Sequence, residues 1–177
     1  MKEWGSVVHA LLDGRQTILL RKGGIRERSF AVRGTTFVLY PTVEHSHHHR
    51  VRPQYADLLA RGAADVAHDR RTLRCRVQLI EVVTVAHPDG LRELGDLHIY
   101  GEEHVEERLA FRPRHPLHVL VAQAAALRPP VTIRTEEEHG GCSSWVDLAL
   151  HWDGNAETPV LTLAELDAVA QRVRSAV

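Results

Sequence analysis

The sequence lacks several features that would assign it to a familiar class. It has only two cysteines, Cys75 and Cys142, so no disulfide framework is implied and we expect reduced thiols. No apolar run approaches the ~20 residues that a membrane span needs. The opening apolar stretch is interrupted by Asp13 and Gly14, which excludes a signal-peptide h-region. We therefore predict a cytoplasmic protein without a membrane partner.

Common nucleotide and hydrolase motifs are also missing. The chain has no G-x-x-x-x-G-K-[ST], G-x-G-x-x-G, C-x-x-C or G-x-S-x-G pattern. Its only lysines are Lys2 and Lys22, so a nuclease site of the D…E-x-K kind is hard to build. With 177 residues, 44% of them hydrophobic and 25% charged, the composition predicts a single globular domain over residues 1–177.

The net charge of −1 hides a strong asymmetry along the chain. Residues 1–80 hold 14 Lys and Arg against 7 Asp and Glu, whereas residues 81–177 hold 8 against 16. A basic half is suited to a polyanionic partner, and an acidic half is typical of a solvated outer face. The sequence therefore predicts nucleic acid as the partner; it does not predict an oligomeric state.

Hydrophobic patterning predicts an α+β fold. Strands are expected at 6–12 and 17–21 around the turn dipeptide Asp13-Gly14, and again on both sides of Arg33-Gly34. Residues 72–85 alternate as a long strand, with a phase slip at Ile80 that indicates a β-bulge. Two further strands are predicted at 144–152 and at 116–127, the latter ended by Pro129-Pro130. Helices are predicted at 52–67, 89–97, 102–111 and 162–173, and the last of them begins with a Thr162–Glu165 capping box. Many short strands with inserted helices favour a small curved sheet or barrel.

The segment Arg21-Lys22-Gly23-Gly24 is the first candidate site. A strand that ends in two cations and two glycines can offer positive charge and free backbone N–H groups to a phosphate. The alternative is a solvated strand end with a glycine turn. Arg112 and Arg114, together with Arg108, surround Phe111 and are candidate phosphate contacts, or else a helix end followed by an extended segment.

Other side chains are candidates for stacking, metal binding or catalysis. Tyr40 and Trp145 are candidate stacking walls for a base, and core packing is the alternative for Trp145. No cofactor is predicted, but Glu44 and His45 would be the best ligands if a divalent metal were bound. Cys142, with His139 nearby, is the alternative nucleophile. The alternative without a function is a polar loop around Glu44 and His45, and tight packing of glycines around Cys142.

Two family resemblances can be stated on these segments. The chain resembles the bacterial family known as domain of unknown function 1802 in KEWGSVVHALLDGRQTILLRKGGIRE, FVLYPTVEH, ERLAFRPRHPLHVLV and HGGCSSWVDL, spread over residues 2–148. That family has no established activity; the resemblance suggests an association with restriction-modification genes.

The chain is also similar, more distantly, to ASCH domains of the PUA-like superfamily. The similar segments, in order, are LLDGRQTILLR, FVLYPT, LRCRVQLIEVVTV and LVAQAAALRPPVTI, followed by HGG. This implies a β pseudo-barrel with inserted helices and a C-terminal helix, which binds RNA or modified bases in a cleft. Gly14 and Arg21 match the pattern, while Gln16 and Leu19 replace the lysine and glutamate that enzymatic members use for amide hydrolysis. The resemblance therefore assigns a functional role to Arg21 alone, and it puts catalysis by this chain in doubt.

Two functional hypotheses result. The first is a PUA/ASCH-like module that binds RNA or DNA, with a flipped or modified base as one form of ligand, linked to restriction-modification or nucleic-acid metabolism. The second is an enzyme acting on nucleic acid or nucleosides, a hydrolase or nuclease that uses Glu44 and His45 with a metal, or Cys142.

Overall fold

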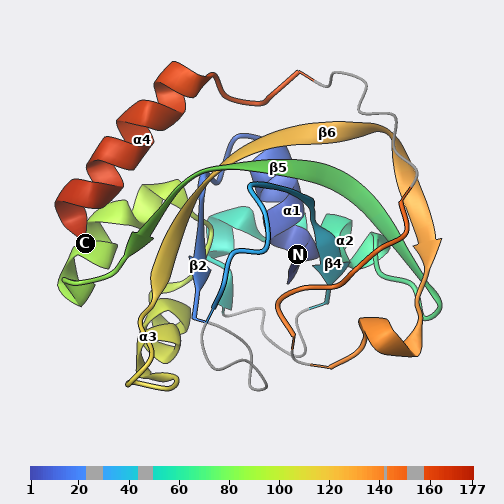
Figure 1. The fold of residues 1–177 in the computed structure, drawn as a ribbon, viewed down its shortest axis with the longest axis horizontal. Helices are drawn as coiled ribbons and strands as arrows, with labels where there is room; N and C mark the ends of the chain where they lie inside the picture. Colours follow the sequence, from blue (N-terminus) through green and yellow to red (C-terminus); the bar gives the residue numbers. More distant parts are fainter. Residues whose placement is uncertain (23–29, 44–49, 142, 151–157) are drawn as a thin grey trace.

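The structure is a computed structural model and describes residues 1–22, 30–43, 50–141, 143–150 and 158–177 (Figure 1). Its centre is an antiparallel sheet with strand order β2-β6-β5-β3, formed by Ile18–Arg21, His118–Arg134, Arg70–Thr84 and Thr36–Val38. β5 and β6 run together as one long arch that curls over the N-terminal half of the chain (Figure 1). The predicted α+β class is confirmed, as a curled half-barrel with helices packed around it.

Two irregularities let the long strands bend. The β5–β6 register shifts between Leu79 and Glu81, so the bulge predicted at Ile80 is confirmed. A second shift occurs where Leu73 pairs with Val131 and Cys75 pairs with Ala126. This corrects the prediction that Pro129-Pro130 ends the strand: the prolines fall between those paired positions, where no ladder N–H is required, and β6 continues to Arg134.

The first predicted strand is wrong, because residues Gly5–Leu12 form helix α1. Every residue from Gly5 to Leu11 is buried, so neither a helical nor a strand period shows in the hydrophobic pattern. Gly14 adopts φ 70°, but it ends the helix rather than forming a hairpin. Its backbone N–H donates to the Leu11 oxygen, and the backbone N–H of Arg15 donates to the Ala10 oxygen.

The hairpin predicted at Arg33-Gly34 is also wrong. Gly34 does not have a positive φ, and no strand precedes it in the described residues 30–34. Instead, β3 is followed after one residue by β4, Tyr40–Thr42, which pairs in parallel with β1, Lys2–Trp4. Residues 143–150 contain no strand either, so the strand predicted from 144 is not present in its described part.

Helices occur at all four remaining places where periodicity predicts them, and the short η4 was not predicted; η2, η3 and η4 are 3-10 helices. α4 begins after Thr162, whose side chain and that of Glu165 form the expected capping box. It packs outside one end of the β5–β6 arch, and α3 lies at the same end (Figure 1). Their bounds are η2 Pro53–Tyr55, α2 Asp57–Ala64, η3 Pro88–Leu97, α3 Glu102–Ala110, η4 Glu137–His139 and α4 Leu163–Ala176. None of the helices in the described residues is long and apolar enough to cross a bilayer.

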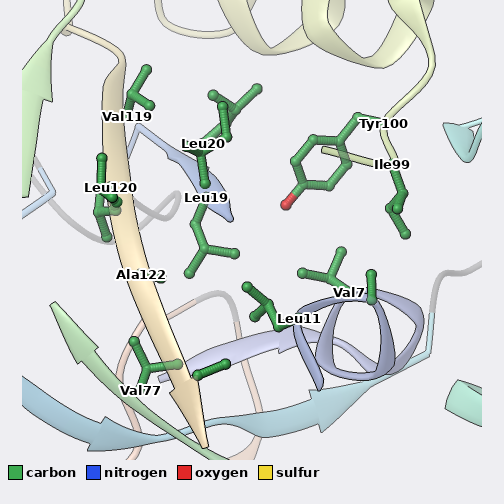
Figure 2. Packing of buried hydrophobic residues seen from close by; sticks show 14 of the residues in the cluster. Val7, Leu11, Leu19, Leu20, Val77, Ile99, Tyr100, Val119, Leu120 and Ala122 are labelled. Atoms are coloured by element: carbon green, nitrogen blue, oxygen red, sulfur yellow. The ribbon is translucent and has the colours of Figure 1, made fainter. Parts of the chain in front are cut away.

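The main core fills the space beneath the arch. Figure 2 shows Val7 and Leu11 of α1 facing Leu19 and Leu20 of β2, with β6 side chains on the other side. The Tyr100 ring enters this cluster with its hydroxyl directed inward (Figure 2). This packing fixes the end of β1, the end of β2 and the start of α3 relative to one another.

Replacing Gly62 by alanine is expected to destabilise the fold. A Cβ there would lie 2.3 Å from the Ser6 nitrogen and 2.5 Å from the Gly5 carbonyl carbon, so α1 and α2 touch backbone to backbone. Alanine gains ~1 kcal/mol in helix propensity, but overpacking costs about 1–3 kcal/mol or more. We expect a net loss, measured by urea unfolding. Gly95→Ala, whose Cβ would meet no heavy atom within 4 Å, is the matched control; equal losses in both variants would contradict the explanation.

Candidate functional site

The exit of β2, predicted to be a cationic phosphate contact, lies inside the protein. Arg21 is 8% exposed, and its guanidinium donates to Glu3 Oε2 at 2.7 Å and to the backbone oxygen of Lys2. Lys22 is 3% exposed and its Nζ donates to the backbone oxygen of Leu109 at 2.6 Å. Strand β1 covers this exit, so Arg21 is not the surface cation that the sequence hypothesis required.

The bond from Lys22 to Leu109 joins this buried pair to the end of α3, and so brings together two of the predicted cationic segments. Arg108 lies in the last turn of α3, close enough to Arg21 and Lys22 for their charges to act on one another. Burial and then the charge of Arg21 lower the pKa of Arg108. Burial and then the charge of Arg108 lower the pKa of Lys22. Positive charge is therefore concentrated at one place and only partly solvated.

A cavity of about 300 Å³ opens over this charge. We call it the Trp4–Arg108 hollow. Trp4 at the end of β1 and Arg50 line one part of it. The rest of the lining comes from α3 and the residue that follows it: His104, Glu107, Arg108 and Phe111. The last four are spaced i, i+3, i+4 and i+7, which places them on one side of the helix and at its end.

Aromatic rings form one wall of the hollow. The Trp4 ring lies 4.6 Å from that of His104 and 5.5 Å, edge-on, from that of Tyr100. Tyr100 and His104 are themselves 5.3 Å apart. Tyr100 packs behind these rings rather than in the lining, and burial raises the pKa of its hydroxyl, which is therefore uncharged. Phe111, 36% exposed, adds a second apolar surface at the opening.

The arginines of the hollow are incompletely paired. Arg50 meets Glu107 at 3.0 Å. Arg108 has neither a hydrogen bond nor an ion pair within the described part of the chain, and its buried Nε has no acceptor there. The buried Nε atoms of Arg21 and Arg50 likewise have no acceptor among the described residues. Two of these N–H groups belong to residues that line the cavity, Arg50 and Arg108, and the third lies beneath it; a buried donor with no partner in the described part of the chain is costly.

The charge at the hollow is unbalanced toward the positive side. Two carboxylates, Glu3 and Glu107, face the four cations Arg21, Lys22, Arg50 and Arg108. A pocket with excess cations, orphan N–H donors and aromatic walls has the chemistry to hold an anion attached to a flat ring.

The predicted stacking walls lie elsewhere. Tyr40 is 2% exposed and packs with Leu73 and Leu127, its ring edge-on to His139 at 5.5 Å. Trp145 packs against Phe37 at 5.0 Å, and its ring nitrogen donates to Ala31. Neither ring lines the Trp4–Arg108 hollow; Tyr40 is buried and Trp145 is half-buried. Trp145 packs against the main core.

Arg112 and Arg114 follow the hollow directly along the chain. Arg112 is half-buried at φ 49° and contacts His115 Nε2 at 3.2 Å, while Arg114 is exposed. The remaining predicted residues, Gly23, Gly24, Glu44, His45 and Cys142, lie outside the described residues. Within the described residues, no group of three or more His, Cys, Asp or Glu side chains is placed to hold a metal ion.

Sequence reasoning missed most of the lining. Trp4, Arg50, His104 and Glu107 were not among the predicted site residues, and Arg108 was noted only as a neighbour of Phe111. A signal was available in the helical spacing of His104, Arg108 and Phe111, but Trp4 was assigned to no element. Gln16, which stands at the lysine position of the ASCH pattern, is fully buried: its amide donates to Ile18 O and accepts from Ile99 N.

Comparison with known proteins supports the family resemblance noted in the sequence. One family model, described as a domain of unknown function (DUF1802), matches residues 1–172, nearly the whole chain. No curated protein and no solved structure matches the chain.

Proposed function

The chain belongs to the DUF1802 family, and we propose that it is a nucleic-acid-binding module whose Trp4–Arg108 hollow receives a phosphate and the nucleotide attached to it. The proposal differs from the sequence hypothesis in the residues that touch the ligand. Arg108 and Arg50 face the cavity, whereas Arg21 and Lys22 contribute charge from the layer beneath it.

The observation that carries the proposal is the guanidinium of Arg108, which has no hydrogen-bond or ion-pair partner among the described residues. A cation that is partly removed from water and lacks an acceptor costs free energy unless a ligand supplies one. A phosphate oxygen is a suitable acceptor, since arginine binds it through two parallel N–H groups. The orphan Nε of Arg50 on the same cavity supports the same ligand chemistry.

The rings of the hollow favour a nucleotide over a bare anion. Trp4 and Phe111 flank the cations, and base stacking on such rings contributes about 1–3 kcal/mol per base. Arg114, exposed four residues beyond the end of α3, would contact the next phosphate along the strand, with Arg112 beside it. This is the interleaving of cations and aromatic rings that single-stranded nucleic acid requires.

We also propose that the half-barrel is of the PUA/ASCH type and that a flipped or modified base is one form of ligand. The support is the order of elements: α1 ends at Leu12, the Gly14 turn follows, and the next strand ends in Arg21 under a bent β5–β6 pair. Gln16 is engaged with backbone groups, so the lysine chemistry of the enzymatic members has no counterpart at that position.

The test is a titration of fluorescein-labelled 12-nucleotide single strands, DNA and RNA, followed by fluorescence anisotropy. Binding of at least one is expected, weakening with salt at a slope of about −0.7 for each phosphate contacted. A morpholino strand of the same sequence, which has a neutral backbone, should not bind. Absence of binding to both strands, or binding that salt leaves unchanged, would contradict the proposal.

A further inference from the structure

Four cations gather at the Trp4–Arg108 hollow. Two of them, Arg50 and Arg108, belong to its lining. A third, Lys22, lies beneath the end of α3, where its Nζ donates to the backbone oxygen of Leu109 at 2.6 Å. The fourth, Arg21, precedes it at the end of β2. The hollow therefore has positive charge both in its wall and in the layer below.

Two carboxylates balance half of this charge. Glu3 accepts from Arg21 at 2.7 Å, and Glu107 meets Arg50 at 3.0 Å. Within the described residues, neither Lys22 nor Arg108 forms an ion pair. Among the Lys, Arg, Asp and Glu side chains in these contacts, an excess of two positive charges remains for a ligand to neutralise.

The size of this excess distinguishes two kinds of phosphate. A phosphodiester inside a strand carries one negative charge. A phosphate monoester, found at a strand end or on a mononucleotide, carries about −1.5 to −2 at pH 7 because its second pKa is about 6. The monoester neutralises the excess, whereas the diester leaves one positive charge unbalanced in a partly desolvated place.

The volume of the hollow favours the same ligand. At about 300 Å³ it lies at the lower end of the range of about 300–1,000 Å³ for ligand pockets. The Trp4 and His104 rings, 4.6 Å apart, form one wall of it. An internal phosphate would bring a nucleotide on each side, but a terminal phosphate brings only one. A single nucleotide suits a hollow of this size.

We propose that the Trp4–Arg108 hollow selects a nucleotide that ends in a phosphate monoester, either a free mononucleotide or the phosphorylated end of a strand. The inference rests on the proposed nucleic-acid function and specifies the form of its ligand. Arg50 and Arg108 contact the monoester oxygens, and Arg21 and Lys22 attract them from the layer below.

The experiment uses 12-nucleotide strands of one sequence, DNA and RNA, with fluorescein on a central base. One strand ends in hydroxyls, two carry a phosphate at the 5′ or the 3′ end, and two carry that phosphate as its methyl ester, which has one charge. Each is titrated with the full chain at pH 7.5 and fixed salt. At least one phosphorylated strand should bind about tenfold more tightly than its methyl ester, because it gains a charged contact.

A competitor distinguishes the two sources of the monoester. Unlabelled adenosine 5′-monophosphate is added to the bound phosphorylated strand, with adenosine as the control; base stacking tolerates any sequence, so adenine is a fair probe. Displacement by the mononucleotide alone would show that a free nucleotide is sufficient. A tightly held phosphorylated strand that it does not displace would assign the site to strand ends.

Two variants change the excess charge in opposite directions. Arg50→Gln lowers the excess to one, so the preference for the monoester over its methyl ester should narrow to about threefold. Glu107→Gln raises it to three, so this preference should widen. Arg134→Met, at the far end of β6, should leave it unchanged. Circular dichroism checks the fold of each variant.

The outcomes separate this inference from the function on which it rests. Equal affinity for the phosphorylated, methyl-ester and hydroxyl-ended strands would overturn the inference and leave nucleic-acid binding in place. Absence of binding by every strand would contradict both. A preference that moves in the same direction in folded Arg50→Gln and Glu107→Gln would also overturn the inference.

Discussion

Arg108→Met is expected to weaken binding of the 12-nucleotide strand by about 30- to 100-fold, equivalent to about 2–3 kcal/mol. The guanidinium faces the Trp4–Arg108 hollow and has no partner in the described residues, so its N–H groups are available to a phosphate. Methionine keeps a long apolar stem, which preserves packing at the end of α3. The measurement is the dissociation constant at fixed salt, together with a salt slope that is less steep than that of the unmodified chain.

The same substitution has a second, opposite consequence for the free protein. Removing a half-buried cation that has no acceptor in the part of the chain that the structure describes relieves a desolvation cost. The free energy of unfolding of Arg108→Met should therefore be unchanged or higher. Arg134→Met is the matched control, because Arg134 is exposed at the far end of β6 (Figure 1). Weakened binding to the same degree in both variants, or a clear loss of stability in Arg108→Met, would contradict this account.

Glu3→Leu is expected to lower the free energy of unfolding by about 3–5 kcal/mol, since it leaves a buried cation uncompensated. Glu3 is 6% exposed and accepts from both the Arg21 guanidinium at 2.7 Å and the Trp4 N–H at 2.9 Å. Among the described residues, the other acceptor of Arg21 is a neutral backbone oxygen, that of Lys2. Urea unfolding followed by circular dichroism measures the loss.

A double substitution isolates the ion pair from other effects at this position. Adding Arg21→Met to Glu3→Leu removes the orphaned cation, and most of the lost stability should return. Glu81→Gln is the control, because Glu81 forms a more exposed ion pair with Arg174. This substitution should lower the free energy of unfolding by less than about 1 kcal/mol. A double variant no more stable than Glu3→Leu would show that the buried charge is not the cause.

The sequence predicts the elements that have a clear period and fails where burial removes it. The bulge at Ile80 follows from a visible phase slip in β5, and α4 from its capping box. By contrast, α1 is buried on nearly every side because it lies under the β5–β6 arch. Asp13-Gly14 suits a helix end as well as a hairpin. Local sequence cannot choose between these.

The lining of the candidate site could not be predicted from local sequence. The bond from Lys22 to Leu109 brings the end of β2 next to the end of α3, which directly precedes Arg112 and Arg114 along the chain. The burial of Arg21 could not be foreseen, because it depends on Glu3 of β1, a strand whose pairing with β4 crosses about 38 residues of sequence. Trp4 enters the hollow through the same pairing.

The most direct test of the central claim is where the nucleic acid sits. The indole N–H resonances of Trp4 and Trp145 are recorded by ¹⁵N NMR during titration with the 12-nucleotide strand, and Trp4→Phe assigns the first of them. The account predicts that the Trp4 resonance moves to saturation while that of Trp145, packed against Phe37, stays in place. A shift of Trp145 with an unmoved Trp4 would place the ligand away from the Trp4–Arg108 hollow and contradict the account.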